Sequence, residues 1–185
     1  VIYPPVEMNH ESGIKNQEKK DYFLAGGRLA RPKHIDLIIK TFEKLDLPLK
    51  IFGRSFANSS NDLITQSPNI QFLGEVSDEE KLKLMSQAKA FVFAAEDEDF
   101  GITPVEAMSV GTPVIAYRSG GVVESIVHGI TGLFFEELSI GSLSNALREF
   151  EKTKFDRGLI SKHAQKFSKE RFKKEIKAFV ESKIR

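Results

Sequence analysis

The sequence predicts an α/β protein with a Rossmann-like, doubly wound parallel sheet of about six strands and helices on both faces. Two patterns predict this fold. Short apolar runs alternate with helical stretches from residue 21 onward, which is the order of βαβ units. The runs are apolar throughout, as in strands that are covered on both faces of a parallel sheet. The length of 185 residues suits one well-filled domain rather than two.

The composition narrows the classes of function. A hydrophobic share of 41% and a charged share of 29% are ordinary for a globular protein, and a net charge of +1 gives no general attraction to nucleic acid. The chain has no cysteine, which excludes disulfides, thiolate metal sites and cysteine nucleophiles. No apolar run approaches the ~18–20 residues that span a bilayer, and no signal peptide is visible. We therefore expect a cytoplasmic protein.

The N-terminal segment is expected to be extended chain followed by a loop. Pro4 and Pro5 disfavour helix before them, and residues 9–21 are polar and interrupted by Gly13. This stretch is a connector or a mobile loop. The chain begins with Val1 rather than Met, which suggests a fragment of a longer protein.

The first half of the domain contains three predicted strands and two predicted helices. The strands are apolar runs that end at glycine: YFLAGG (22–27), LKIFG (49–53) and IQFLG (70–74). Residues 34–45 place their apolar side chains on one helical face. A capping box at Ser77–Glu80 opens a helix through Ala88, and the polar stretch 55–68 has room for a short helix.

The second half continues the alternation. Three further apolar runs are predicted strands: AFVFAA (90–95), PVIAY (113–117) and GLFF (132–135). A short helix over 103–110 is closed by Gly111 and Pro113, and another follows over 122–127. Residues 139–182 are helical and amphipathic. In such sheets ligands bind outside the carboxyl ends of the strands, which selects five loops: 26–33, 53–55, 74–76, 96–103 and 118–121.

The loop AGGRLARPK after the first strand is a candidate anion site. Gly26 and Gly27 allow a sharp turn and close approach of a ligand. Arg28 and Lys33 follow, and two cations here suit a diphosphate, the arginine as a fork and the lysine as a point charge. The alternative is surface charge beside a turn. G-x-G-x-x-G and G-x-x-x-x-G-K-[ST] are absent from this loop, so dinucleotide-binding and ATP-hydrolysing sites lose their main support.

The stretch EDEDFGITPVEAM after the fourth strand offers a second candidate. Thr103-Pro-Val-Glu106 fits a capping box with Thr103 at the N-cap, which is a complete structural explanation of Glu106. The backbone N–H groups of residues 100–103 also lie at a helix N-terminus, where an anion is stabilised. Both interpretations of Glu106 stay open.

The four acids that open this stretch need compensation. A row of carboxylates beside an anion is costly unless cations are near, and Arg28 and Lys33 are the candidates. The carboxylates then face neutral hydroxyl groups, so a ligand with both a diphosphate and sugars suits the loop. Asp97 and Asp99 also form a short D-x-D pattern that can hold a divalent metal, but it is common in loops. No histidine lies at metal-ligand spacing: His10, His34, His128 and His163 are interpreted as surface or packing residues.

These motifs in this order resemble the C-terminal, donor-binding domain of GT-B fold glycosyltransferases, in the large retaining group 1 (family 4) that includes sucrose synthases and many mannosyltransferases. The resemblance covers nearly all of residues 21–182 and is carried by five motifs: GGRLARPKHIDLII, LKIFG, IQFLGEVSDEE, EDFGITPVEAMSVGTPVIAYRSGGVVESI and HGITGLFF. The fourth motif carries the Glu-x7-Glu signature of the family as Glu98 and Glu106. The sequence departs from the common pattern at His34, where the family often has glycine.

The resemblance implies roles for individual residues. Arg28 and Lys33 match the basic pair that binds the donor diphosphate, and with Glu98, which contacts the donor sugar, they are the expected catalytic residues. Glu106 matches the acid that holds the ribose hydroxyls. The remaining expected substrate-binding residues belong to the loops near the base, the sugar and the distal phosphate: Gly27, Gly53, Arg54, Gly74, Val76, Phe100, Gly101, Ile102 and Thr103.

The resemblance also implies an activity and partners. The expected function is transfer of a hexosyl group, with mannose from GDP-mannose suggested by the wording EDFGITPVEAM, to a saccharide or lipid-linked acceptor. No cofactor and no metal are expected, because cations and a helix N-terminus neutralise the leaving group. Residues 1–20 would be an interdomain connector and mobile loop, and residues 21–185 the nucleotide-sugar-binding domain. An N-terminal acceptor domain would be missing, and the full-length enzyme would associate with the inner face of a membrane.

Two alternatives remain. One is a non-catalytic nucleotide-binding or regulatory module on the same fold, since a fold does not fix a function. The other is a relative that uses a sugar phosphate, such as a phosphorylase or an epimerase. The first would tolerate loss of Glu98, and the second would tolerate loss of Glu106.

Overall fold

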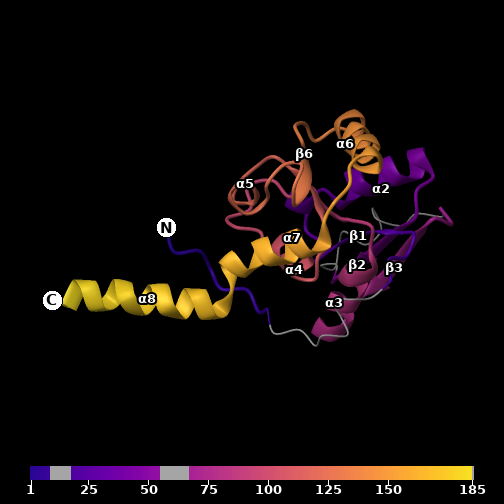
Figure 1. The fold of residues 1–185 in the computed structure, drawn as a ribbon. Helices are drawn as coiled ribbons and strands as arrows, with labels where there is room; N and C mark the ends of the chain where they lie inside the picture. Colours follow the sequence, from indigo (N-terminus) through magenta and orange to yellow (C-terminus); the bar gives the residue numbers. More distant parts are fainter. Residues whose placement is uncertain (9–17, 55–66, 185) are drawn as a thin grey trace.

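The computed structural model describes residues 1–8, 18–54 and 67–184. Its centre is a six-stranded sheet in the order β3-β2-β1-β4-β5-β6, in which every neighbouring pair is parallel (Figure 1). The strands are β1 Phe23–Gly26, β2 Leu49–Phe52, β3 Ile70–Gly74, β4 Phe91–Phe93, β5 Val114–Tyr117 and β6 Gly132–Phe135. The order reverses between β1 and β4, as in a doubly wound fold. The predicted fold class is confirmed.

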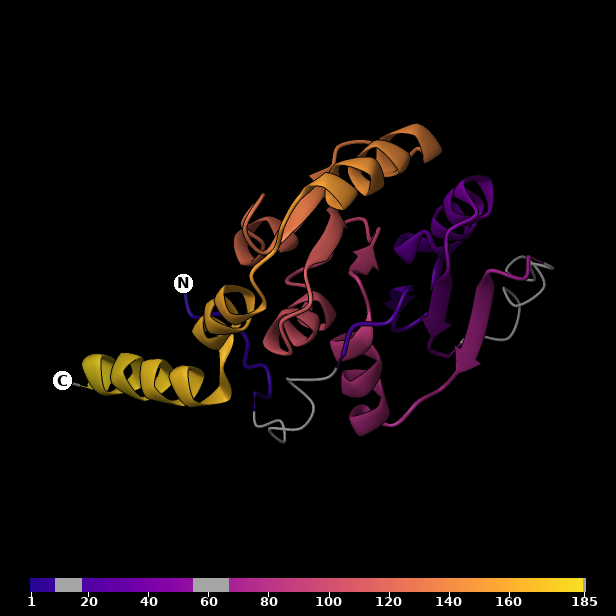
Figure 2. The same ribbon diagram turned by 45° about the vertical axis from the view of Figure 1, so that its right-hand side comes forward.

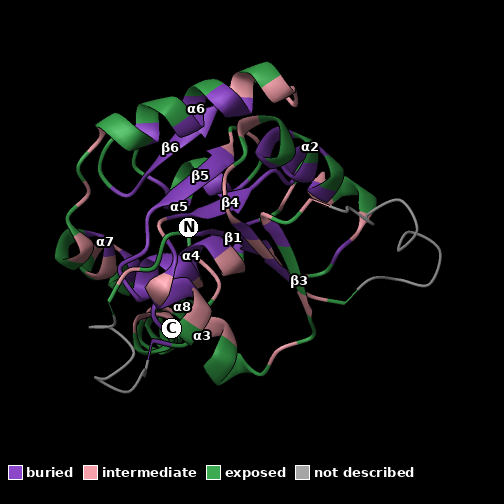
Figure 3. Cartoon of the chain, turned by 90° about the vertical axis from the view of Figure 1, so that its right-hand side faces the viewer, coloured by how far each residue is buried: buried purple, intermediate pink, exposed green. Residues whose placement is uncertain are grey.

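Helices cover both faces of the sheet. They are η1 Arg31–Lys33, α2 Ile35–Leu45, α3 Asp78–Gln87, α4 Ile102–Ser109, α5 Val122–Ser125, α6 Ile140–Lys152, α7 Arg157–Ala164, η3 Gln165–Phe167 and α8 Lys169–Ile184. Figures 2 and 3 show α2 and α6 on one side of the sheet and α3 and α4 on the other.

The two faces have separate cores because successive strand residues point in opposite directions. In β1, Phe23 packs with the apolar face of α2 and α6, whereas Leu24 packs with α3, α4 and α7. Phe42 of α2 and Phe150 of α6 both meet the Phe23 ring edge to face, at centroid distances of 5.3 and 5.6 Å. This double coverage explains why the central strands are apolar throughout.

The edge strand β3 differs from that pattern. Ile70 is buried, but Gln71 and Phe72 are exposed, with Phe72 at 41%. Within the described residues, β3 is the edge strand of the sheet and pairs with β2 alone. The short helix considered within 55–68 falls largely outside the described residues, as does most of the loop over 9–21.

The C-terminal region is helical as predicted and consists of α6, α7 and α8, with the short η3 between the last two. Its last helix, α8, projects from the domain beside the N-terminal segment and contains no buried residue (Figure 1). Val6 forms a parallel bridge with Ser168, and the Arg171 guanidinium donates a hydrogen bond to the Tyr3 carbonyl at 2.9 Å. Among the described residues, none of the helices is both long and apolar enough to cross a membrane.

Candidate functional site

A cavity of about 660 Å³ opens at the carboxyl ends of β1 and β4, where the strand order reverses. It is lined by the loop after β1 and by the acidic loop after β4. Five of the thirteen predicted substrate-binding residues line it: Gly27, Arg28, Lys33, Glu98 and Thr103. Residues 65 or more positions apart in the sequence are thus brought to one site by the parallel topology.

Glycines let the loops after β1, β2 and β3 pack backbone to backbone. The Gly27 N–H donates to the Phe52 carbonyl at 3.1 Å, and the Gly53 N–H donates to the Gly74 carbonyl at 2.7 Å. Gly53 has a φ of 131°, and a Cβ there would lie 1.9 Å from the Gly27 carbonyl oxygen. Gly53 and Gly74 therefore shape the site from behind without lining this cavity.

Two cations differ in what they contact. Lys33 is paired with Glu98 across the cavity, and its amine lies over the Phe93 ring at 4.9 Å from the centroid. Arg28 is exposed and has no ion-pair partner among the described residues. One cation is thus paired with an acid of the same cavity, whereas the other has no ion-pair partner among the described residues.

The acidic loop is held at its start by η1 and α2. The Glu96 N–H donates to the Pro32 carbonyl at 2.9 Å, and the Glu96 carboxylate lies 3.2 Å from His34 Nε2. His34 has a φ of 46°, in the left-handed region that favours glycine. This backbone conformation accounts for the glycine that the resemblance places there. His34 does not line the cavity itself but contacts Glu96, which does.

The loop over 118–121 holds the other end of the acidic loop. The Gly121 N–H donates to the Glu98 carbonyl at 2.7 Å. A Cβ on Gly120 would lie 2.3 Å from the Glu98 carbonyl oxygen, and a Cβ on Gly121 would lie 2.2 Å from that of Asp99. The predicted topology placed this loop among the candidate ligand loops, but its support of the acidic loop was not predicted. The Gly-Gly pair directly after a predicted strand was the signal for such close packing.

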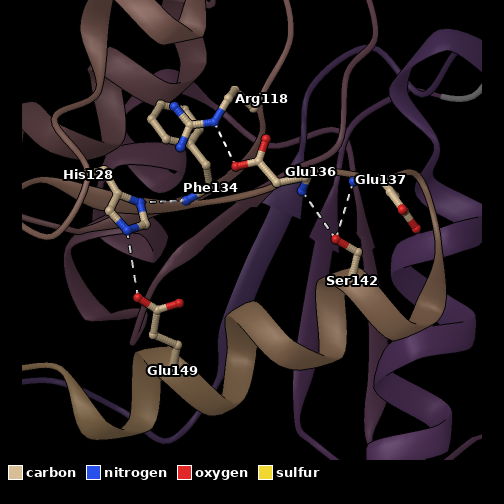
Figure 4. Close-up of polar contacts among 7 residues, drawn as sticks. All are labelled: Arg118, His128, Phe134, Glu136, Glu137, Ser142 and Glu149. Atoms are coloured by element: carbon tan, nitrogen blue, oxygen red, sulfur yellow. Dashed lines mark hydrogen bonds and ion pairs between the residues drawn. The ribbon is translucent and has the colours of Figure 1, made fainter.

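Arg118 anchors that supporting loop to β6. Its Nε donates to Glu136 at 2.7 Å, and its guanidinium lies 4.3 Å from the centroid of the Phe134 ring (Figure 4). The Ser142 hydroxyl accepts hydrogen bonds from the Glu136 and Glu137 N–H groups at 3.1 and 3.2 Å. His128 stacks on the same phenyl ring. None of these residues lines the cavity, so the network bears on it through the loop over 118–121.

The predicted capping box at Thr103 is wrong. Helix α4 begins at Ile102, its N-cap is Gly101 with a φ of 81°, and no side chain caps it. The left-handed glycine starts the helix earlier than the pattern suggested. Thr103 therefore lies inside the first turn and lines the cavity. Glu106 is left without the backbone N–H that a capping box would have given it.

Glu106 instead pairs with Lys81 of α3, a residue that the sequence did not indicate. The Lys81 amine lies 2.9 Å from Glu106 Oε1 and 2.9 Å from Asp78 Oδ1. Burial raises the pKa of the Glu106 carboxyl, against the opposing effect of Lys81. Burial lowers the pKa of the Lys81 amine, but its two acidic partners outweigh this and leave it raised. The pKa of each group therefore depends on the presence of the other.

The remaining predicted residues lie outside the lining of this cavity. Arg54 and Glu75 form an exposed pair 3.7 Å apart, beside half-buried Val76. Phe100 is buried and stacks on Tyr3 at a centroid distance of 5.7 Å, and Ile102 is 46% exposed. Asp97 and Asp99 line the cavity, but within the described part of the chain no three His, Asp or Glu side chains gather as a metal site.

Comparison with known proteins matches this arrangement to one family. The family profile described as "Glycosyl transferases group 1" matches residues 8–174. The alpha-1,3/1,6-mannosyltransferase ALG2 of Rhizomucor pusillus is 30% identical over 170 residues, which cover 86% of this chain and 36% of that protein. The O-antigen chain mannosyltransferase RfbU of Salmonella typhimurium is 36% identical over 122 residues, which cover 62% of this chain and 34% of that protein.

Solved structures agree on the fold. A crystal structure of Anabaena Alr3699/HepE in complex with UDP and glucose matches with a TM-score of 0.80 at 20% identity, over 98% of this chain and 56% of that chain. The likeness confirms the predicted Rossmann-like fold with GT-B relatives. The chain spans less than half the length of the two curated relatives named above.

Proposed function

Because this chain belongs to the glycosyl transferases group 1 family, we propose that it binds the nucleotide-sugar donor of a retaining hexosyl transfer. The acceptor would bind mainly to a further, N-terminal domain, as the resemblance implies. The chain alone would then bind the donor and transfer little or nothing.

One observation carries this proposal. Arg28, Lys33 and Glu98 line a single cavity at the point where the strand order reverses. Two cations suit the diphosphate of a donor, and a carboxylate suits the hydroxyl groups of its sugar. Each partner alone has a simpler explanation as surface charge, but their meeting in one cavity favours a ligand that carries both groups.

The proposed chemistry depends mainly on the leaving group. When the bond between the sugar and the diphosphate breaks, negative charge develops on the departing phosphate oxygen. Arg28 and Lys33 would stabilise that charge in place, which lowers the barrier because the cations are already positioned. The acceptor hydroxyl oxygen forms the new bond to the sugar carbon, and its proton passes to the departing diphosphate or to water. We propose that no metal ion is needed for this neutralisation.

The ion pair between Lys33 and Glu98 implies an exchange of partners on binding. The diphosphate would take the Lys33 amine and a sugar hydroxyl would take the Glu98 carboxylate. Arg28 is exposed and would make the first contact. A donor therefore replaces an internal pair with two ligand contacts, and a nucleoside diphosphate without a sugar would leave Glu98 uncompensated.

The identity of the donor is a further proposal. Several relatives are named as mannosyltransferases, which favours GDP-mannose, whereas the Anabaena structure was solved with UDP and glucose. Calorimetric titration of the folded chain with GDP-mannose, UDP-glucose, GDP and UDP tests whether the chain binds a nucleotide and which donor it prefers. We expect binding of one nucleotide-sugar in preference to the other. Absence of binding to all four by a folded sample would contradict the proposal.

Sugar-transfer measurements on a longer protein that contains this chain would distinguish an enzyme from a regulatory module. Glu98→Ala should abolish sugar transfer in an enzyme, because the acid contacts the transferred group. A regulatory module would keep its function with the same substitution.

A further inference from the structure

Lys81 reaches from α3 to the only ionisable side chain of α4. Its amine lies 2.9 Å from Glu106 Oε1, and the Lys81 and Glu106 side chains are only 18% and 20% exposed. Asp78, by contrast, is 94% exposed and gives Lys81 a second partner at 2.9 Å. The contact between Lys81 and Glu106 is therefore shielded from water, whereas the contact between Lys81 and Asp78 is not.

Glu106 depends on Lys81 because no other cation among the described residues compensates its charge. Only Lys81 and Asp78 act on it electrostatically, and Asp78 is itself an acid. Strands β4 and β5 beneath α4 bring no charged side chain. The charged or titratable residues of α7 are directed elsewhere: Arg157 donates to the Ser86 and Val110 carbonyls, His163 contacts the Ser125 carbonyl, and Lys162 is exposed. Removing one partner of a shielded pair leaves an uncompensated charge.

The pair also leaves part of Glu106 available. Lys81 occupies Oε1, and no group in the described part of the chain donates a hydrogen bond to Oε2. Glu106 stands three residues after Thr103 on α4, so the two side chains are neighbours on one side of the helix. Thr103 lines the cavity. The unoccupied oxygen is thus one helical turn from the proposed donor site.

We infer that Lys81 is a positioning residue of this site: it keeps Glu106 charged and oriented so that one carboxylate oxygen remains for hydroxyl groups of the nucleotide. The inference rests on the proposed function and adds a residue to it. Lys81 would not contact the ligand itself. Its effect would appear only with ligands that offer hydroxyl groups to Glu106.

The inference predicts a change in selectivity rather than a general loss of affinity. In Lys81→Met, the Glu106 carboxyl loses its cation, and its pKa rises further because burial is then unopposed. A neutral carboxyl accepts weaker hydrogen bonds than a carboxylate. Affinity for a ribonucleotide should fall roughly tenfold at about pH 5.5, the scale of one charge-assisted hydrogen bond, and recover at higher pH.

The test compares a nucleoside diphosphate with its 2′-deoxy and 3′-deoxy analogues by calorimetry at about pH 5.5 and about pH 8, where an unperturbed Glu stays ionised. The variants are Lys81→Met, Lys81→Arg and, as a matched control, Lys83→Met. Lys83 lies on the same helix, is exposed, and its substitution removes the same charge. We expect Lys81→Met to weaken the ribonucleotide much more than the deoxy analogues. Lys81→Arg should restore the preference, and Lys83→Met should match the wild type.

Four outcomes decide the question. If the wild type prefers the ribonucleotide and Lys81→Met does not, the inference holds. If Lys81→Met keeps the wild-type preference at both pH values, the inference is overturned while the proposed function stands. If the folded wild type binds no nucleotide, the proposed function falls and the inference with it. A purely structural role for Lys81 would weaken all the ligands equally.

Discussion

The Lys33 and Glu98 side chains already neutralise each other in the cavity, whereas Arg28 has no ion-pair partner among the described residues. Arg28 is therefore the more sensitive probe of a diphosphate site, because its removal breaks no ion pair among the described residues. Lys33 substitutions would also leave Glu98 uncompensated.

Arg28→Ala should lower the affinity for a nucleoside diphosphate by ~1.5–3 kcal/mol, the range for a hydrogen bond to a charged group. The measurement is calorimetric titration. Arg31→Ala is the control, since Arg31 is exposed three residues away and does not line the cavity. Equal affinities of Arg28→Ala and the wild type would show that Arg28 does not bind the diphosphate.

A second residue, Lys19, has a perturbed pKa and does not line the cavity. Its amine donates to the Ala88 carbonyl and to the Thr112 hydroxyl, the latter at 2.8 Å. Burial, with a smaller contribution from Arg157, lowers the pKa of Lys19 to about 7. The unfolded chain therefore binds a proton that the folded chain has lost between about pH 7 and the ordinary pKa near 10.4.

From this sign, the free energy of unfolding should rise between about pH 7 and about pH 9.5, with Lys19 contributing up to ~1.4 kcal/mol per pH unit. Denaturant unfolding of the wild type and Lys19→Met measures it. The variant should show a shallower rise, and Lys20→Met, at an exposed neighbour, should keep the wild-type slope. Parallel slopes for all three proteins would contradict the lowered pKa.

At this scale the candidate site residues could be predicted from the sequence, but the side chains with which they pair could not. Arg28, Lys33 and Glu98 followed from motifs, and their meeting followed from the parallel topology. The Lys81–Glu106 pair joins residues 25 positions apart on two different helices, and no local pattern encodes it. The capping box was a local pattern, and the left-handed Gly101 displaced it.

Among the elements, the loop over 118–121 controls the acidic loop most directly. Gly121 has a φ of −68°, which any residue can adopt, so its importance lies only in the close approach to Asp99. Arg118 fixes the same loop to β6 (Figure 4). An element that lines no part of the cavity therefore sets the position of Glu98.

Gly121→Ala should lower the free energy of unfolding by ~1–3 kcal/mol, because the new methyl group meets a carbonyl oxygen at 2.2 Å and the loops must separate. It should also weaken nucleotide-sugar binding. Gly141→Ala in α6 is the matched control: its Cβ has no atom nearer than 4.0 Å, and alanine suits a helix better than glycine. Equal stabilities of the two variants would refute the close approach.

The place and order of the strands were predictable, since a strand covered on both faces is apolar throughout. Their ends were less exact: the predicted strand over 90–95 is observed only at Phe91–Phe93. Helix α2 was equally clear from its apolar face, and Ser77 caps α3 as predicted by accepting from the Glu80 N–H at 3.1 Å. The breaks between α6, α7 and α8 were not predicted, although local capping residues mark two of them. The Asp156 side chain accepts a hydrogen bond from the Leu159 N–H at the start of α7, and the Ser168 hydroxyl accepts one from the Arg171 N–H at the start of α8.

At the scale of the whole molecule, the chain matches less than half of the length of its curated relatives. Helix α8 buries none of its side chains here, and Ile176, Phe179 and Val180 on it are exposed. The resemblance implies an N-terminal acceptor domain that this chain does not contain. This chain would then bind the donor, whereas sugar transfer would require a longer protein that contains it.

The most direct measurement is a two-dimensional NMR titration of the folded chain with GDP and UDP, which reports binding and its location together. We predict saturable shifts that are largest at the amides of residues 27–33 and 98–103, around the cavity at the carboxyl ends of β1 and β4. Shifts centred instead on the separate cavity of about 610 Å³ beside Gly111 and Ser161 would contradict the account, as would a spectrum that neither nucleotide changes.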